Sequence, residues 1–154
     1  MILPDWKIRQ MCAEGLVSPY DEGMVNPASL DLRMGVGWYD FDARQVLPVG
    51  GLEPVRTVLV TTLEVVTLPL DVAGQLVLKS SMGRRGVSMP AAGWVDPGFG
   101  GTLTVQLSTC VPVEFEVGQP FLQMVLYRMA GNPDDGYDGR YQGQRGVTLE
   151  RRGG

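Results

Sequence analysis

Turn-forming residues interrupt this chain at short intervals, and that spacing limits the folds it can adopt more than any other feature. The 154 residues include 21 glycines and 11 prolines. Between the Gly, Pro and Asp clusters lie short runs of β-branched and apolar residues, which are typical of strands: 55–60, 64–68, 74–78, 102–107, 113–117 and 121–127. This pattern predicts a mostly β fold, a distorted β-barrel or jelly roll rather than an α/β sheet. No repeat or linker divides the sequence, so we expect a single domain over residues 1–154.

One segment near the N-terminus has helical periodicity instead. Apolar side chains recur there at roughly helical spacing: Trp6, Ile8, Met11, Cys12 and Leu16. Asp5 can cap the start of this helix, and Gly15 can close its end. A weaker helical turn is expected over residues 27–30.

The last 24 residues, 131–154, differ in character from the rest of the chain. Residues 132–136 form a polar break, and those that follow are rich in Gly, Arg and Gln with few core-forming side chains. Two interpretations stay open for this tail. It is either a frayed terminus or a mobile lid that orders over a charged ligand.

Composition excludes several classes of protein. The net charge of −4 argues against a nucleic-acid binder, and no apolar run is long enough to span a bilayer or to act as a secretory signal. We therefore expect a cytoplasmic protein with no nucleic-acid or membrane partner. Its two cysteines are expected to be buried thiols, and a disulfide between them is the alternative. The chain has no histidine, which removes Ser-His-Asp and Cys-His catalysis and the common zinc sites. Its chemistry must use Asp, Glu, Lys, Arg, Ser, Thr or Tyr, with or without a hard metal ion.

Two segments carry groups suited to a phosphorylated ligand. Residues 79–86 read Lys-Ser-Ser-Met-Gly-Arg-Arg-Gly, which combines hydroxyl donors, glycines and cations as phosphate oxygens require. A solvated turn would also have this composition. Residues 91–101 read Ala-Ala-Gly-Trp-Val-Asp-Pro-Gly-Phe-Gly-Gly, a hairpin-like turn with Asp96 at its corner. An Asp before Pro-Gly is usually a turn former, so this segment alone is a weak signal.

Together with two further segments, these motifs resemble the dUTPase and dCTP deaminase superfamily. Residues 79–86 look like its Arg-Ser-Ser-x-x-Arg-x-Gly phosphate motif, and residues 92–101 look like its base-binding hairpin. Residues 25–35, Val-Asn-Pro-Ala-Ser-Leu-Asp-Leu-Arg-Met-Gly, resemble the N-terminal signature of dCTP deaminases, and residues 140–146, Arg-Tyr-Gln-Gly-Gln-Arg-Gly, resemble their C-terminal lid. The four motifs occur in the family's order over nearly the whole chain, and the match is closest to the deaminase branch.

The resemblance implies a homotrimer with active sites between subunits that binds dUTP, dCTP or both. Mg²⁺ would be carried by the triphosphate and water, with no direct protein ligand. The implied phosphate-binding residues are Lys79 (where Arg is usual), Ser80, Ser81, Arg84 and Arg140. The implied base-binding residues are Ala91, Ala92, Gly93, Trp94 and Val95 through their backbone, together with Gln106 and Gln144.

One position departs from the deaminase pattern. Deaminases of this family carry a proton-shuttling glutamate in a segment like Leu-Thr-Leu-Glu-Leu, whereas residues 103–107 here read Leu-Thr-Val-Gln-Leu. The amide of Gln106 cannot titrate, so it can contact a pyrimidine but cannot act as a general acid–base. Asp96 aligns with the residue that dUTPases use to activate a water for attack on the α-phosphorus.

These two positions together lead us to expect an Mg²⁺-dependent pyrophosphatase that hydrolyses dUTP, or both dUTP and dCTP, to the monophosphate and pyrophosphate. Two alternatives stay open. One is a dCTP deaminase, with or without a second hydrolytic activity, that uses another proton relay or carries Gln106 as an inactivating change. The other is a non-catalytic nucleotide-binding relative.

Overall fold

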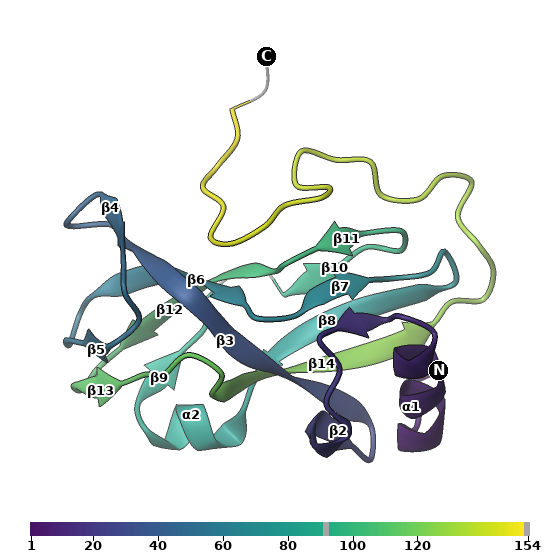
Figure 1. Cartoon of the computed structure of the whole chain (residues 1–154), viewed down its shortest axis with the longest axis horizontal. Coiled ribbons are helices and arrows are strands. Elements are labelled where there is room, and N and C mark those ends of the chain that lie inside the picture. The colour runs from purple at the N-terminus through teal and green to yellow at the C-terminus, as the bar shows by residue number, and fades with distance from the viewer. Residues whose placement is uncertain (91–92, 153–154) are drawn as a thin grey trace.

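A computed structural model describes residues 1–90 and 93–152 of the chain, and it is mostly β, as the turn spacing predicts (Figure 1). The predicted N-terminal helix is present as α1 (Asp5–Ala13), and its apolar face buries Ile8, Met11 and Cys12. The prediction that Asp5 caps the start of this helix is wrong. Pro4 is the N-cap, while Asp5 lies in the first turn and accepts a hydrogen bond from Arg9 at 2.6 Å. The helix ends before Gly15, whose φ of +100° is a conformation that glycine adopts without strain.

The helical turn expected over residues 27–30 is also wrong. After the short strand β1 (Val17–Ser18) and the 3₁₀ turn η1 (Glu22–Met24), the chain forms β2 (Val25–Asn26) and turns back into β3 (Ser29–Asp40). Val25 lies opposite Leu30 and Asn26 opposite Ser29, so these residues close a tight antiparallel hairpin rather than a helix. The pairing to a neighbouring strand overrides the local preference that Pro27 suggested.

The strand β3 is the longest in the structure and joins its two halves (Figure 1). Its first half pairs with β14 (Pro120–Arg128) and its second half with β6 (Thr57–Thr62) and β4 (Gln45–Leu47). The register shifts between Met34 and Trp38, where Gly35 passes so close to β6 that an added Cβ would lie 2.8 Å from the Thr62 carbonyl oxygen. Gly37 has a φ of +77° at the same bend. The two glycines therefore let one strand serve both halves of the curled sheet.

The main sheet has the order β10-β8-β14-β3-β6-β12-β9, with β2 and β4 attached to β3. The remaining strands of this path are β8 (Val72–Leu78), β9 (Val87–Ser88), β10 (Trp94–Val95) and β12 (Thr104–Thr109). A smaller sheet pairs β1 with β7 (Val65–Thr67) and β7 with β11 (Gly100–Gly101), and β5 (Gly51–Leu52) pairs with β13 (Val113–Glu114). Each of the six predicted apolar runs overlaps a strand, although the run at 113–117 is reduced to two residues. A short helix, α2 (Ser80–Arg84), follows β8.

The core fills the space inside the curled sheet. Its fully buried side chains include Phe121, Leu122 and Met124 from β14 and Leu30 and Leu32 from β3. Cys12 belongs to this core as expected, but Cys110 is exposed, and both thiols are free. Within the two described ranges, no helix is long and apolar enough to cross a membrane.

A buried ion pair fixes β3 to the turn before β7. Glu64 is buried and accepts hydrogen bonds from the Arg33 backbone N–H at 2.9 Å and from its Nε at 2.7 Å. Because one carboxylate serves both the backbone and the side chain of one residue, the pair holds the register of β3 just before its bend.

Candidate functional site

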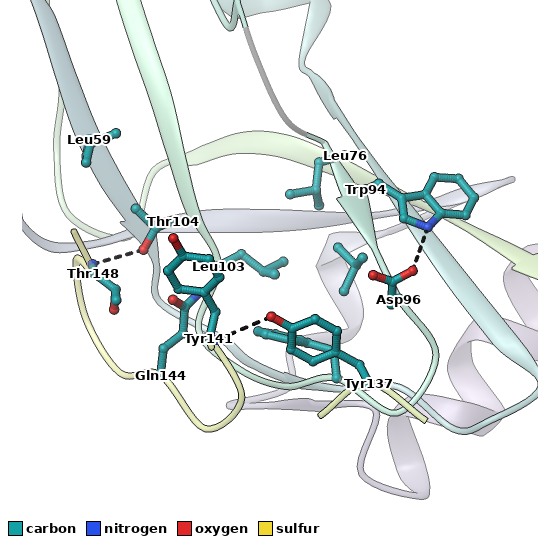
Figure 2. A pocket seen from close by; sticks show the side chains of 12 residues that line it. Leu59, Leu76, Trp94, Asp96, Leu103, Thr104, Tyr137, Tyr141, Gln144 and Thr148 are labelled. Carbon is teal, nitrogen blue, oxygen red and sulfur yellow. Dashed lines mark hydrogen bonds between the residues drawn. The ribbon is translucent and has the colours of Figure 1, made fainter. Parts of the chain in front are cut away.

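A cavity of about 400 Å³ lies between β6, β8, β10, β12 and the C-terminal tail (Figure 2). This volume is within the usual range for small-molecule sites. The residues that line it are Leu59, Leu76, Trp94, Val95, Asp96, Phe99, Leu103, Thr104, Tyr137, Tyr141, Gln144 and Thr148. Trp94, Val95, Asp96 and Gln144 are the members of this set that the sequence also singled out as site residues.

The hairpin at the cavity wall depends on a close backbone approach. Gly93 precedes β10, and its carbonyl oxygen accepts a hydrogen bond from the Leu76 N–H of β8. A Cβ at Gly93 would lie 2.5 Å from the Leu76 carbonyl oxygen, so no larger residue fits without a backbone shift. This contact sets Trp94 opposite Gln75 and Val95 opposite Gly74, which directs the next residue, Asp96, to the cavity rim.

Asp96 supplies the cavity's negative charge. Among the described lining residues it carries the one carboxylate, and none of them is Lys or Arg. Its Oδ1 accepts a hydrogen bond from the indole Nε1 of Trp94 at 3.1 Å, and its side chain is exposed. The cavity therefore combines an apolar interior with one accessible carboxylate at its edge.

Two tyrosines of the tail, which none of the sequence motifs marks as site residues, form the opposite wall. Tyr137 packs against Phe99 with ring centroids 5.7 Å apart, and its hydroxyl accepts a hydrogen bond from the Tyr141 N–H at 3.2 Å. Both rings line the cavity (Figure 2). The signal that could have found them is the presence of aromatic residues in a polar, glycine-rich segment that has no core of its own.

Hydrogen bonds hold the tail along the segment that follows Asp96. The Tyr137 N–H donates to the Pro97 carbonyl at 2.8 Å, and the Gly143 N–H donates to the Gly100 carbonyl at 2.7 Å. Gln144 is buried; its side-chain amide donates to the Thr102 carbonyl at 2.7 Å, and its own carbonyl accepts from the Thr102 N–H at 3.0 Å. These contacts argue against a frayed terminus. Whether the tail opens and closes as a lid stays a prediction.

The predicted phosphate-binding residues lie elsewhere. Ser80, Ser81 and Arg84 are exposed on α2, which Figure 1 shows on the other side of the sheet from the tail. Lys79, just before α2, is ion-paired with the buried Asp31, whose other oxygen accepts from Asn26 at 2.7 Å. None of these residues lines the cavity. Within a single chain, the phosphate motif and the base-binding hairpin therefore lie apart.

The arginines of the motif and of the tail have different surroundings. Arg85 donates to the Glu114 carbonyl and lies 5.9 Å over the Phe115 ring, whereas Arg84 has no ion pair within residues 1–90 and 93–152. Arg140 in the tail is exposed and donates to the Arg151 carbonyl at 3.2 Å, away from α2.

Gln106 lies beside the cavity but does not line it. It stands on β12 directly opposite Leu59 of β6, and Leu59 is a lining residue. Thr104, two positions earlier on the same face of β12, also lines the cavity. Ala91 and Ala92, which the resemblance assigns to base binding, lie outside the described residues.

Comparisons with known proteins give a consistent result. A family model described as dCTP deaminase-like matches residues 2–129. The dCTP deaminase of Thermococcus kodakarensis is 39% identical over 157 residues, which are 99% of this chain and 99% of that protein. The dCTP deaminase of Pyrococcus horikoshii is 36% identical, over 99% of this chain and 98% of that protein. A "dCTP deaminase, dUMP-forming" of Parafrankia sp. is 38% identical, over 98% of this chain and 90% of that protein.

Two solved structures share the fold. A 2′-deoxycytidine 5′-triphosphate deaminase from Agrobacterium tumefaciens matches with a TM-score of 0.72 and 24% identity, over 81% of this chain and 47% of that one. The dUTPase of EIAV matches with a TM-score of 0.53 and 20% identity, over 82% of this chain and 93% of that one. At these identities the likenesses show the fold alone, and they confirm the expected dUTPase-like architecture.

The relatives overturn the expectation of a dUTP-hydrolysing pyrophosphatase. Full-length similarity at 36–39% identity joins the chain to proteins named as dCTP deaminases, one of them a dUMP-forming deaminase. That expectation rests on one position, Gln106, whereas the similarity extends over the rest of the chain. A single side chain changes a proton relay, whereas the fold and the shape of the cavity depend on all of the sequence.

Proposed function

The chain belongs to the dCTP deaminase-like family, and we propose that it deaminates dCTP. The observation that carries this proposal is the similarity along the full length of both chains to proteins named dCTP deaminase. In this reaction the oxygen of water bonds to C4 of the cytosine ring and the bond from C4 to the exocyclic nitrogen breaks. dCTP and water thus give dUTP and ammonia.

The cavity has the chemistry that a pyrimidine deoxynucleoside needs. Leu59, Leu76 and Phe99 provide apolar surface for the base and the sugar, and Tyr137 and Tyr141 enclose them from the tail. An apolar enclosure of this kind excludes bulk water, which strengthens the effect of the few polar groups at its edge.

In this proposal Asp96 moves the proton. A carboxylate beside C4 can accept a proton from the attacking water and return it to the departing amine. Gln106 has no proton to exchange, but its amide can donate to and accept from the polar edge of a pyrimidine next to Leu59. Asp96 is the carboxylate within the described wall of the cavity, and this supports its assignment.

We further propose that the triphosphate is bound between two copies of the chain in a homotrimer. The described lining of the cavity offers no cation to a triphosphate, while Ser80, Ser81 and Arg84 are exposed on α2 on the other side of the same subunit. A neighbouring copy could bring α2 to the cavity edge and supply charge-assisted hydrogen bonds. Static light scattering tests this, and a monomer mass at working concentration would contradict it.

Mg²⁺ belongs to the same proposal. Within the described residues no group of three or more His, Cys, Asp or Glu side chains is arranged to hold a metal ion. The donor set therefore fits an ion that arrives with the nucleotide and completes its shell with phosphate and water oxygens, as this hard cation prefers. When bound it would offset phosphate charge. A cytoplasmic location, where deoxynucleotides are made and used, completes the proposal.

The test is to incubate the purified chain with dCTP and Mg²⁺, measure ammonia with a coupled assay, and separate the nucleotides by chromatography. We expect ammonia in equal amount to the uracil nucleotide formed, and the product, dUTP or dUMP, shows which kind of relative the chain follows. Asp96→Asn should lower turnover at least about a hundredfold, the scale of a lost general base.

Gln106→Glu is the matched comparison, because it replaces an amide by a carboxylate of the same size. If the parent chain releases no ammonia and Gln106→Glu does, the native protein is not a deaminase and the proposal fails. If neither releases ammonia although both bind dCTP in calorimetric titration, the chain is a nucleotide-binding relative and the proposal fails as well.

A further inference from the structure

Trp94 presents a large aromatic side chain to solvent at the rim of the cavity. Its relative exposure is 60%, although the next residue, Val95, is buried. An indole that is this exposed contributes little to the core, so burial does not account for it. Its side chain makes a polar interaction at the cavity: the Nε1–H donates to Oδ1 of Asp96 at 3.1 Å.

An aromatic contact with Tyr127 holds the indole ring in place. Trp94 lies against Tyr127 of β14, with centroids 6.2 Å apart and planes inclined by 30°. The Tyr127 hydroxyl in turn donates to Oε1 of Gln75 on β8 at 2.7 Å, and Gln75 lies opposite Trp94 in the sheet. Three strands therefore fix the orientation of the indole, and with it the direction of its N–H.

The hydrogen bond leaves the two oxygens of Asp96 in different environments. Oδ1 accepts from the indole, while the other oxygen faces the cavity (Figure 2). Asp96 has no ion pair within the part of the chain that the structure describes. The indole is thus the side-chain group that orients this carboxylate.

We infer that Trp94 is a positioning residue, whose indole N–H holds Asp96 with Oδ2 directed at the water and the pyrimidine in the cavity. This inference rests on the proposed deaminase function and adds a role for a side chain that the sequence assigned only through its backbone. Without the indole, the exposed carboxylate would rotate among its staggered rotamers, and only a fraction of them would aim an oxygen at the cavity.

Two substitutions separate the N–H from the ring. Trp94→Phe keeps an aromatic ring against Tyr127 but removes the donor. Trp94→Gln removes the ring but keeps a donor, since the Gln amide nitrogen is the same number of bonds from Cα as the indole nitrogen. We expect Trp94→Phe to lower kcat by on the order of 10- to 100-fold with little change in KM, the scale of a misdirected catalytic group. Trp94→Gln should recover most of that loss.

Two outcomes of this comparison would overturn the inference. If Trp94→Phe is as active as the parent while Trp94→Gln is impaired, the ring acts by stacking and the N–H is dispensable. If both variants lose activity equally, the donor does not account for the effect of Trp94.

A second readout does not depend on turnover. The Trp94 indole N–H resonance, identified by its loss in Trp94→Phe, should move in Asp96→Asn, because that substitution replaces a charged acceptor by a neutral one and weakens the hydrogen bond. A resonance that is insensitive to this substitution would overturn the inference even if dCTP is deaminated. A parent protein that releases no ammonia would overturn the proposed function, and the resonance would still decide whether the indole holds the carboxylate.

Discussion

The attachment of the tail can be tested at Gln144, whose side chain is buried against the segment that follows Asp96. Gln144→Ala removes the hydrogen bond of 2.7 Å from its amide to the Thr102 carbonyl. Thr102 is itself buried, so its carbonyl oxygen loses a donor where water reaches it poorly. Leaving such a group unsatisfied costs about 1–3 kcal/mol. The docked tail should therefore open roughly 5- to 150-fold more often than in the parent, since 1.4 kcal/mol is about a factor of ten.

Limited trypsin digestion measures this opening, because the tail carries cleavage sites at Arg140 and Arg145. When opening and closing are fast relative to cleavage, the rate follows the population of the open form. We expect faster cleavage at the two sites, while sites outside the tail keep their parental rate. Gln10→Ala is the control, because Gln10 is a glutamine on α1 whose side chain bonds, within the described residues, to Lys7 and Glu14 nearby in sequence. A folded Gln144→Ala protein cleaved at the parental rate would refute the reasoning.

Three further predictions follow from other parts of the chain. In the Asp96→Asn background, where we expect turnover to be low, Arg84→Ala should weaken binding of dCTP by roughly 2–3 kcal/mol in calorimetric titration, as expected for a lost charge-assisted contact. An Ellman assay on the native protein should detect Cys110 before Cys12, because burial raises the pKa of the Cys12 thiol to about 11 while Cys110 is exposed. The backbone N–H of Ala43 lowers the pKa of Asp40, so Asp40→Asn should reduce stability to urea near pH 7. That deficit should shrink as the pH falls through the lowered pKa, because the wild-type carboxylate then loses its charge too.

A strand could be predicted where one short apolar run forms one strand that keeps the same neighbouring strand on each side. The run at 121–127 lies within β14, which pairs with β8 over residues 122–128 and with β3 over residues 120–124. The longest strand, β3, was missed because Gly35 and Gly37 interrupt its apolar pattern. Those glycines are required by a bend at which the strand changes partners, and local sequence does not contain that information.

The candidate site was predictable only in part, for a similar reason. Asp96 and its hairpin were identified from a contiguous motif, and they line the cavity. Tyr137 and Tyr141 were missed because their partners, such as Phe99, lie about 40 positions away in the sequence and meet them only in the folded chain. The function predicted from Gln106 was wrong. One substituted position says less about the activity than the similarity of all the other residues to those of the relatives.

The hydrogen bonds between the tail and residues 97–104 have a kinetic consequence. The tail lines the cavity and is hydrogen-bonded to the stretch of chain that directly follows Asp96. A movement of the tail is therefore coupled to the segment that carries this carboxylate. If the cavity holds the nucleotide as proposed, we expect the nucleotide to leave only after these bonds break. Its residence time is then set by how often the tail detaches and not by its own contacts alone. Under the proposed function, we therefore expect faster proton transfer at Asp96 to raise turnover only up to the rate at which the tail releases the product.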